Sequence, residues 1–165
     1  MIHRLVLMGV AGCGKSAVGA ALQQQTGLTY IDGDALHSAA NIAKMSAGHP
    51  LEDADRWPWL DSVAMVLTRD APVAVGCSAL RRSYRDRIRY GAGDGVIFVY
   101  LQGSKPLIAA RMAARTAHFM PLGLLDSQFA ALEPPTKDEA HLTVSIDQPL
   151  AAIVQDIVAK LGPFA

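Results

Sequence analysis

Short apolar runs and longer amphipathic stretches alternate along this chain. The runs are typical of buried strands and lie at residues 2–8, 29–31, 72–77, 96–101 and 142–146. Between them, helical periodicity begins at Lys15 and stops before Gly27, recurs over residues 60–67 and 81–90, and follows Pro106 and Pro149. Strands that alternate with helices predict a parallel sheet covered on both faces. We therefore expect one α/β domain of three layers over residues 1–165, with about five strands in its sheet.

Composition narrows the class of protein without identifying it. The 165 residues are 51% hydrophobic, which excludes a disordered chain, and no apolar stretch approaches the roughly 20 residues of a membrane span. Lysine and arginine total 15, as do aspartate and glutamate, so the formal net charge of +0 gives no overall attraction for nucleic acid or an anionic membrane. Any anion must be bound by a local arrangement.

The start of the sequence lacks a secretory signal, and Cys13 and Cys77 lack CxxC spacing, so we expect reduced thiols and a cytoplasmic location.

The segment GVAGCGKS at residues 9–16 matches the pattern G-x-x-x-x-G-K-[ST] between an apolar run and a helix. Its glycines allow backbone N–H groups to face a phosphate, and the N-terminus of the helix adds positive potential. We expect Lys15 to reach the β- and γ-phosphates of ATP and the Ser16 hydroxyl to ligate Mg²⁺. A glycine-rich turn without a ligand is the alternative, and Cys13 is expected to be a small filler and not a redox group. The predicted nucleotide-binding residues are Gly9, Val10, Ala11, Gly12, Cys13, Gly14, Lys15, Ser16 and Ala17.

A phosphate loop occurs in switches, motors and kinases, and the rest of the sequence favours a kinase. The GTPase patterns N-K-x-D and D-x-x-G are absent, and the chain is short for the coupling machinery of a motor. Asp32 and Asp34 follow the second strand, at the edge where such sheets bind ligands. Asp32 is expected to support Mg²⁺, and Asp34 to accept the proton of an attacking hydroxyl. An ordinary Asp-Gly turn is the alternative.

Several further blocks resemble gluconokinases of the small P-loop type. They are DGDALH at 32–37, DADRWPWL at 53–60, CSALRRSYRD at 77–86 and LEPP at 132–135, and they lie in family order within residues 5 to 147. The resemblance implies a P-loop kinase fold with a substrate-binding helical segment at about 34–70 and a lid at about 111–133. It also implies a homodimer and ATP-dependent, in-line phosphorylation of D-gluconate at its C6 hydroxyl, which gives 6-phospho-D-gluconate. A kinase of another small hydroxylated acid, such as shikimate, and a non-catalytic nucleotide-binding protein are the alternatives.

Gluconate carries one carboxylate and several hydroxyl groups, so its site needs cations and polar side chains. Arginine forks suit a carboxylate, and the i, i+4 spacing of Arg81 and Arg85 predicts that they face one way. Whether Arg81 or Arg82 faces the ligand stays open, and a solvated basic helix is the alternative. Trp57 and Trp59 are expected to pack this segment and not to stack on a ligand. The substrate contacts that the resemblance implies come from Asp34, His37, Lys44, Arg56, Arg81, Arg85 and His118.

Arg111 and Arg115 lie one helical turn apart in the segment that resembles the lid. Cations that close over ATP would stabilise the charge on the transferred phosphoryl group and exclude water. The predicted catalytic residues are therefore Lys15, Asp34, Arg111 and Arg115. Arg111 and Asp147 are also expected beside the nucleotide, with capping of a helix as the alternative role of Asp147. Lys15, Arg56, Arg81, Arg111 and Arg115 are expected to converge on one crevice.

Overall fold

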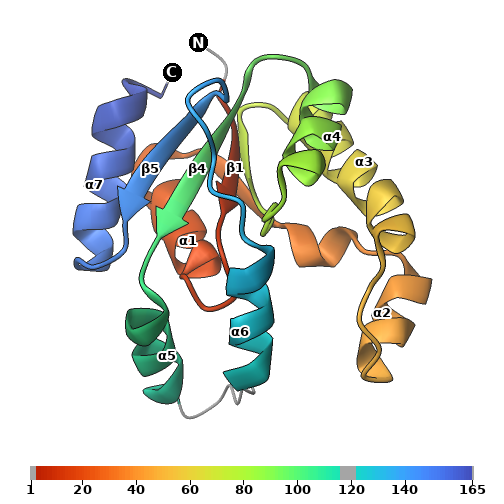
Figure 1. Ribbon diagram of the computed structural model, residues 1–165. Coiled ribbons are helices and arrows are strands. Elements are labelled where there is room, and N and C mark those ends of the chain that lie inside the picture. The colour runs from red at the N-terminus through yellow and green to blue at the C-terminus, as the bar shows by residue number, and fades with distance from the viewer. Residues whose placement is uncertain (1–2, 116–121, 165) are drawn as a thin grey trace.

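The computed structural model describes residues 3–115 and 122–164 and contains a five-stranded sheet (Figure 1). All neighbouring strands pair in parallel, in the order β2-β3-β1-β4-β5. The central strand places Leu5 opposite Ala74 on one side and Ile97 on the other. The predicted parallel α/β architecture is confirmed. The strands are β1 (Arg4–Met8), β2 (Thr29–Asp32), β3 (Val73–Gly76), β4 (Val96–Gln102) and β5 (His141–Ser145).

Helices cover both faces of this sheet and give the expected three layers. One face is covered by α1 (Lys15–Thr26) and α7 (Leu150–Leu161), and the other by α3 (Asp53–Arg69) and α4 (Arg82–Ala92). None of the described helices is both long and apolar enough to cross a membrane. The remaining helices are the short 3₁₀ helix η1 (Gly33–Leu36), α2 (Ala39–Ser46), α5 (Lys105–Ala113) and α6 (Leu122–Ala131).

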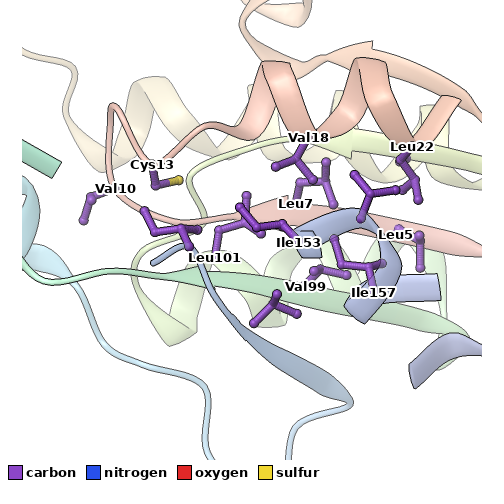
Figure 2. Packing of buried hydrophobic residues seen from close by; sticks show 14 of the residues in the cluster. Leu5, Leu7, Val10, Cys13, Val18, Leu22, Val99, Leu101, Ile153 and Ile157 are labelled. Atoms are coloured by element: carbon purple, nitrogen blue, oxygen red, sulfur yellow. The ribbon is translucent and has the colours of Figure 1, made fainter. Parts of the chain in front are cut away.

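Successive residues of β1 enter two separate hydrophobic cores. Leu5 and Leu7 pack in the core formed with α1 and α7, which Figure 2 shows from close by. Val6 and Met8 point the opposite way, into the core formed with α3 and α4. Side chains alternate between the two faces of a strand, so a strand covered on both faces must be apolar at every position. This is why the strands stand out in the sequence as continuous apolar runs.

Glycine defines both ends of α1 at the predicted positions. Gly14 precedes the helix with a φ of 101°, and Gly27 follows it with a φ of 76°. Both values lie in the left-handed region, which glycine adopts without the steric cost of a Cβ. The predicted helix between Lys15 and Gly27 is confirmed, and its N-terminus lies directly after the phosphate loop.

The two ends of the described chain meet at one edge of the sheet. His3 Nε2 lies 3.2 Å from the carbonyl oxygen of Pro163, and the rings of His3 and Phe164 have centroids 4.5 Å apart. His3 precedes β1, whereas the phosphate loop follows it. The ends of the described chain therefore lie near the amino-terminal ends of the strands, and the phosphate loop lies at their carboxyl-terminal ends (Figure 1).

Candidate active site

The phosphate loop turns sharply between β1 and α1. Gly9 N donates to the carbonyl oxygen of Ser78 at 3.2 Å, and Cys13 N donates to that of Val10 at 3.2 Å. Gly9 has a φ of 150°, and a Cβ there would come within 3.0 Å of the Leu101 carbonyl oxygen, so only glycine fits this turn. The Cys13 side chain lies in the core beside Val10 and Leu101 (Figure 2), and burial raises the pKa of its thiol. These properties suit a filler better than a reactive thiol.

Lys15 bends back over the loop that precedes it. Its Nζ donates to the carbonyl oxygens of Gly9 and Val10 at 3.0 and 3.2 Å. Both acceptors are uncharged, so they hold the ammonium group in place without neutralising it. An anion at the loop would meet this positive charge together with the N-terminus of α1.

A cavity of about 780 Å³ opens beside the loop, at the carboxyl-terminal edge of the sheet. Parallel α/β sheets bind their ligands at this edge. The cavity brings Ser16, Asp32 and Asp34 together with the cations Lys15 and Arg115, and four further predicted residues of the phosphate loop line it, namely Ala11, Gly12, Gly14 and Ala17. Its full lining consists of Ala11, Gly12, Gly14, Lys15, Ser16, Ala17, Tyr30, Asp32, Asp34, Met45, Gly76, Ser78, Arg115, Leu124 and Gln128.

The two predicted aspartates lie on a tight turn where β2 passes into η1. Asp32 caps η1, because its Oδ1 accepts a hydrogen bond from Asp34 N at 3.0 Å. Gly33 between them packs against β3, where a Cβ would come within 2.2 Å of the Gly76 carbonyl oxygen. On the other side, Trp59 Nε1 donates to the Gly33 carbonyl oxygen at 2.8 Å. The Asp-Gly turn is therefore enclosed by the sheet and α3, with both carboxylates at the cavity.

Three lining residues with polar side chains were not predicted from the sequence. Gln128 accepts a hydrogen bond from Ala11 N at 3.1 Å and so brings α6 against the phosphate loop. Ser78 enters the cavity from the segment that follows β3. Tyr30 packs against Gly76, where a Cβ would come within 2.2 Å of its hydroxyl, and burial raises the pKa of Tyr30. Ser78 lies within the block CSALRRSYRD but was given no role, and for Tyr30 the one signal is the glycine within the apolar run at 72–77, which indicates close packing.

Two of the basic residues predicted to bind substrate form ion pairs with carboxylates at the start of α3. Lys44 Nζ lies 2.7 Å from Asp55 Oδ2, and Arg56 Nη1 lies 3.1 Å from Asp53 Oδ1. A hydrogen bond from Tyr84 and the one from Arg56 lower the pKa of Asp53, and Lys44 lowers that of Asp55. Neither Lys44 nor Arg56 is among the described residues that line the cavity.

The arginines around the start of α4 separate into three environments. Arg82 Nη2 lies 2.6 Å from Asp138 Oδ2, whereas Arg81 is exposed and its side chain forms no hydrogen bond or ion pair with any described residue. Arg85 is fully buried, and its Nε and Nη2 donate to the two carboxylate oxygens of Glu139 at 2.7 and 3.1 Å. The prediction that Arg85 binds substrate is wrong, because its guanidinium is enclosed with Glu139. The prediction that Arg81 and Arg85 face one way is also wrong, because Arg81 precedes the first turn of α4.

The predicted lid residues are only partly brought to the cavity. Arg115 lines it, whereas Arg111 on α5 is half-buried and is not among the lining residues described. Asp147 is exposed after β5, and its backbone N donates to Ser145 Oγ at 3.2 Å. His118 lies outside the described residues.

The oxygen ligands available in the cavity suit Mg²⁺ better than a transition metal. Ser16 and Asp32 provide a hydroxyl and a carboxylate, and Mg²⁺ in phosphate sites takes few protein oxygens and completes its shell with phosphate and water. Among residues 3–115 and 122–164, no group of three or more histidine, cysteine or acidic residues could hold a metal. The donor set therefore fits a metal that arrives with a nucleotide.

Comparison with known proteins gives a consistent result. Residues 5–135 match the family model described as an AAA domain. The chain is 42% identical to the thermoresistant gluconokinase of Escherichia coli over 161 residues, which covers 94% of this chain and 91% of the relative. It superimposes on the crystal structure of a gluconokinase from Sinorhizobium meliloti with a TM-score of 0.89 and 49% identity, covering 96% and 91% of the two chains. A shikimate kinase from Bacteroides thetaiotaomicron, with a TM-score of 0.64 and 13% identity over 98% and 99% of the chains, shares the fold alone.

Proposed function

The chain belongs to the gluconokinase family, and we propose that it transfers the γ-phosphoryl group of ATP to the C6 hydroxyl of D-gluconate, giving 6-phospho-D-gluconate. The single observation that supports this most strongly is the cavity that unites Lys15, Ser16, Asp32, Asp34 and Arg115. It combines a phosphate-binding loop with a carboxylate pair, which phosphoryl transfer to a hydroxyl requires.

The phosphate loop and the cations around it bind ATP. The loop amides and the N-terminus of α1 hold the phosphates, and Lys15 exchanges its carbonyl acceptors for phosphate oxygens. Arg115 and Arg111 stabilise charge on the transferred group, and Asp147 lies beside the adenine. Ser16 and Asp32 would hold Mg²⁺, which would supply positive charge against the β- and γ-phosphates.

Asp34 is the base of the reaction. Its carboxylate lies at the cavity on the turn that Asp32 caps, where it accepts the proton of the attacking hydroxyl. Arg81, whose guanidinium is exposed, and Arg56 bind the gluconate carboxylate. His37, Lys44 and His118 contact its hydroxyl groups. The ion pairs with Asp53 and Asp55 hold Arg56 and Lys44 in place at the start of α3.

Two wider properties follow from the resemblance to small P-loop gluconokinases. The protein acts as a homodimer and works in the cytoplasm. The buried, unpaired cysteines Cys13 and Cys77 agree with a reducing compartment.

The decisive experiment measures ADP release with a coupled assay across a panel of sugar acids and shikimate. We expect turnover with D-gluconate and a kcat/KM at least about 100-fold lower with shikimate. Lys15→Ala should abolish turnover while the circular dichroism spectrum is unchanged, and Lys137→Ala at an exposed position is the matched control. Turnover with shikimate but not with gluconate, or full activity in Lys15→Ala, would refute the proposal.

A further inference from the structure

We propose that Trp59 is a positioning residue that fixes the direction of the Asp34 carboxylate by anchoring the peptide group between Gly33 and Asp34. This inference rests on the proposed role of Asp34 as the base, and it goes beyond the packing role that the sequence predicted for Trp59. The tryptophan lies on α3, 26 residues from Gly33 along the chain, and is 8% exposed.

The peptide group that leads into Asp34 is held at both of its polar ends. Its oxygen, the Gly33 carbonyl, accepts the hydrogen bond of Trp59 Nε1 at 2.8 Å, and this bond is buried. Its nitrogen, Asp34 N, donates to Asp32 Oδ1 at 3.0 Å. Fixing both ends of a planar peptide group fixes the plane itself, and with it the position of the Asp34 Cα from which the carboxylate side chain extends.

The hydrogen bond within the short helix itself is weak. A 3₁₀ helix of four residues has poor hydrogen-bond geometry, and His37 N lies 3.4 Å from the Asp34 carbonyl oxygen that it contacts. Behind the turn, the Gly76 carbonyl oxygen blocks movement toward β3, because it already sits where a Gly33 Cβ would lie. Movement of the peptide away from β3 is therefore opposed by the indole of Trp59.

The same indole also orients His37. The two rings are stacked, with centroids 4.2 Å apart and planes 16° apart. Asn41 Nδ2 donates to His37 Nδ1 at 3.2 Å and to the Asp55 carbonyl oxygen at 3.0 Å. Because Nδ1 is an acceptor in this arrangement, His37 carries its proton on Nε2, which leaves a donor for a hydroxyl group. Trp59 thus holds the turn and its neighbouring histidine in one rigid assembly.

Trp57 provides a matched control on the same helix. It is half-buried, its ring meets Tyr84 edge-on with centroids 5.8 Å apart, and Arg87 lies 6.0 Å above it. No described residue accepts a hydrogen bond from its indole nitrogen. Exchange of either tryptophan for phenylalanine removes a similar volume, but only at position 59 does it remove a bond to the Asp-Gly turn.

The test compares Trp59→Phe with Trp57→Phe in the gluconate-dependent assay. Misplacement of a catalytic group by about 1 Å lowers rates on the order of 100-fold, so for a partly released turn we expect the kcat of Trp59→Phe to fall about tenfold. Its KM for ATP should stay within about twofold of wild type, because the phosphate loop follows β1 whereas the Asp-Gly turn follows β2. Trp57→Phe should leave kcat and both KM values within about twofold. Equal kcat values in the two variants would overturn the proposal.

A second variant separates the hydrogen bond from packing. The chain has two tryptophans, so in a Trp57→Phe background Trp59 alone is replaced when benzothienylalanine is incorporated in place of tryptophan. Its ring sulfur preserves the shape of indole and removes the N–H donor. We expect the tenfold loss of kcat with an unchanged thermal midpoint. Wild-type kcat in this protein would show that Trp59 only packs.

A double-mutant cycle separates this inference from the role of Asp34. Asp34→Asn should lose most single-turnover activity, and Trp59→Phe should then cause no further loss, because its effect passes through Asp34. If Asp34→Asn keeps wild-type turnover, the proposed base is wrong. Asp34→Asn is expected to keep a small residual rate. If adding Trp59→Phe lowers that residual rate as much as it lowers the wild-type rate, Asp34 stands as the base and the positioning role of Trp59 is refuted.

Discussion

Replacing Arg85 by methionine removes one partner of the most deeply buried ion pair among the described residues. The side chains of Arg85 and Glu139 are each 1% exposed. Besides its two bonds to Glu139, Arg85 donates through Nη1 to the carbonyl oxygens of Ala79 and Leu80 at 2.9 and 3.2 Å. Methionine is of similar length but leaves Glu139 and these carbonyl groups without that donor.

The remaining partners of Glu139 set the size of the effect. Removing one member of a buried ion pair costs about 3–5 kcal/mol of unfolding free energy. Glu139 keeps a hydrogen bond from Arg89 Nη2 at 2.8 Å and one from Thr136 N at 2.9 Å. We therefore expect Arg85→Met to fall at the lower end, about 3 kcal/mol less stable at neutral pH.

The loss of stability depends on pH in a defined direction. Burial alone would raise the pKa of Glu139, but hydrogen bonds from Arg85, Thr136 N and Arg89 lower it from 4.5 to about 2. The ionised Glu139 therefore stabilises the folded protein fully above about pH 4.5, and this contribution is lost as the pH falls toward 2. Without Arg85 the folded-state pKa rises, so the variant lacks this contribution. The difference in unfolding free energy between the two proteins should narrow from pH 4.5 to pH 2.

Urea denaturation followed by far-UV circular dichroism, at neutral pH and at several acidic values, measures this difference. Arg87→Met is the matched control, because Arg87, which lies on α4 as Arg85 does, forms an exposed pair with Asp61 of α3, and its loss should leave the denaturation midpoint nearly unchanged. Equal midpoints for Arg85→Met and wild type at neutral pH, or a difference that is constant with pH, would refute the argument.

Two further predictions concern packing at the site and in the core. Gly33→Ala should lower the unfolding free energy by about 1–3 kcal/mol and reduce turnover, because its Cβ would meet the Gly76 carbonyl oxygen. Calorimetry and the kinase assay measure these effects. Gly123→Ala is the control, because a Cβ at Gly123 would meet no atom within 4 Å. Cys77 is fully buried, and burial raises the pKa of its thiol to about 12. A disulfide reagent at about pH 8 should therefore label Cys77 only after denaturation, and mass spectrometry showing rapid labelling of the native protein at this residue would contradict its burial.

The strands and the phosphate loop could be predicted because their signals are local. The inner strands β1, β3 and β4 are apolar along most of their length since both sheet faces are covered, and the loop is a continuous pattern of eight residues from Gly9 to Ser16. Helix α2 was not predicted as a separate element, because it has only eight residues, and two of its apolar residues, Ile42 and Met45, are exposed in the fold. Short helices give too few turns for periodicity to identify them.

The contacts that complete the site lie far apart in the sequence. Gln128 meets Ala11 across 117 residues, and Arg85 meets Glu139 across 54. Sequence spacing placed Arg85 on a substrate-binding face, but only the fold reveals a buried carboxylate beside it. Local patterns indicate which chemistry is present, whereas the assignment of each charge to a ligand or to a structural partner depends on the three-dimensional arrangement.

The meeting of the chain ends at His3 and Pro163 has a practical consequence. Both ends lie on the edge of the sheet opposite the cavity. An affinity tag, a fluorescent label or a surface attached through either end would leave the catalytic opening facing the solution. Immobilisation through the ends is therefore a suitable geometry for single-molecule or biosensor measurements of nucleotide and gluconate binding.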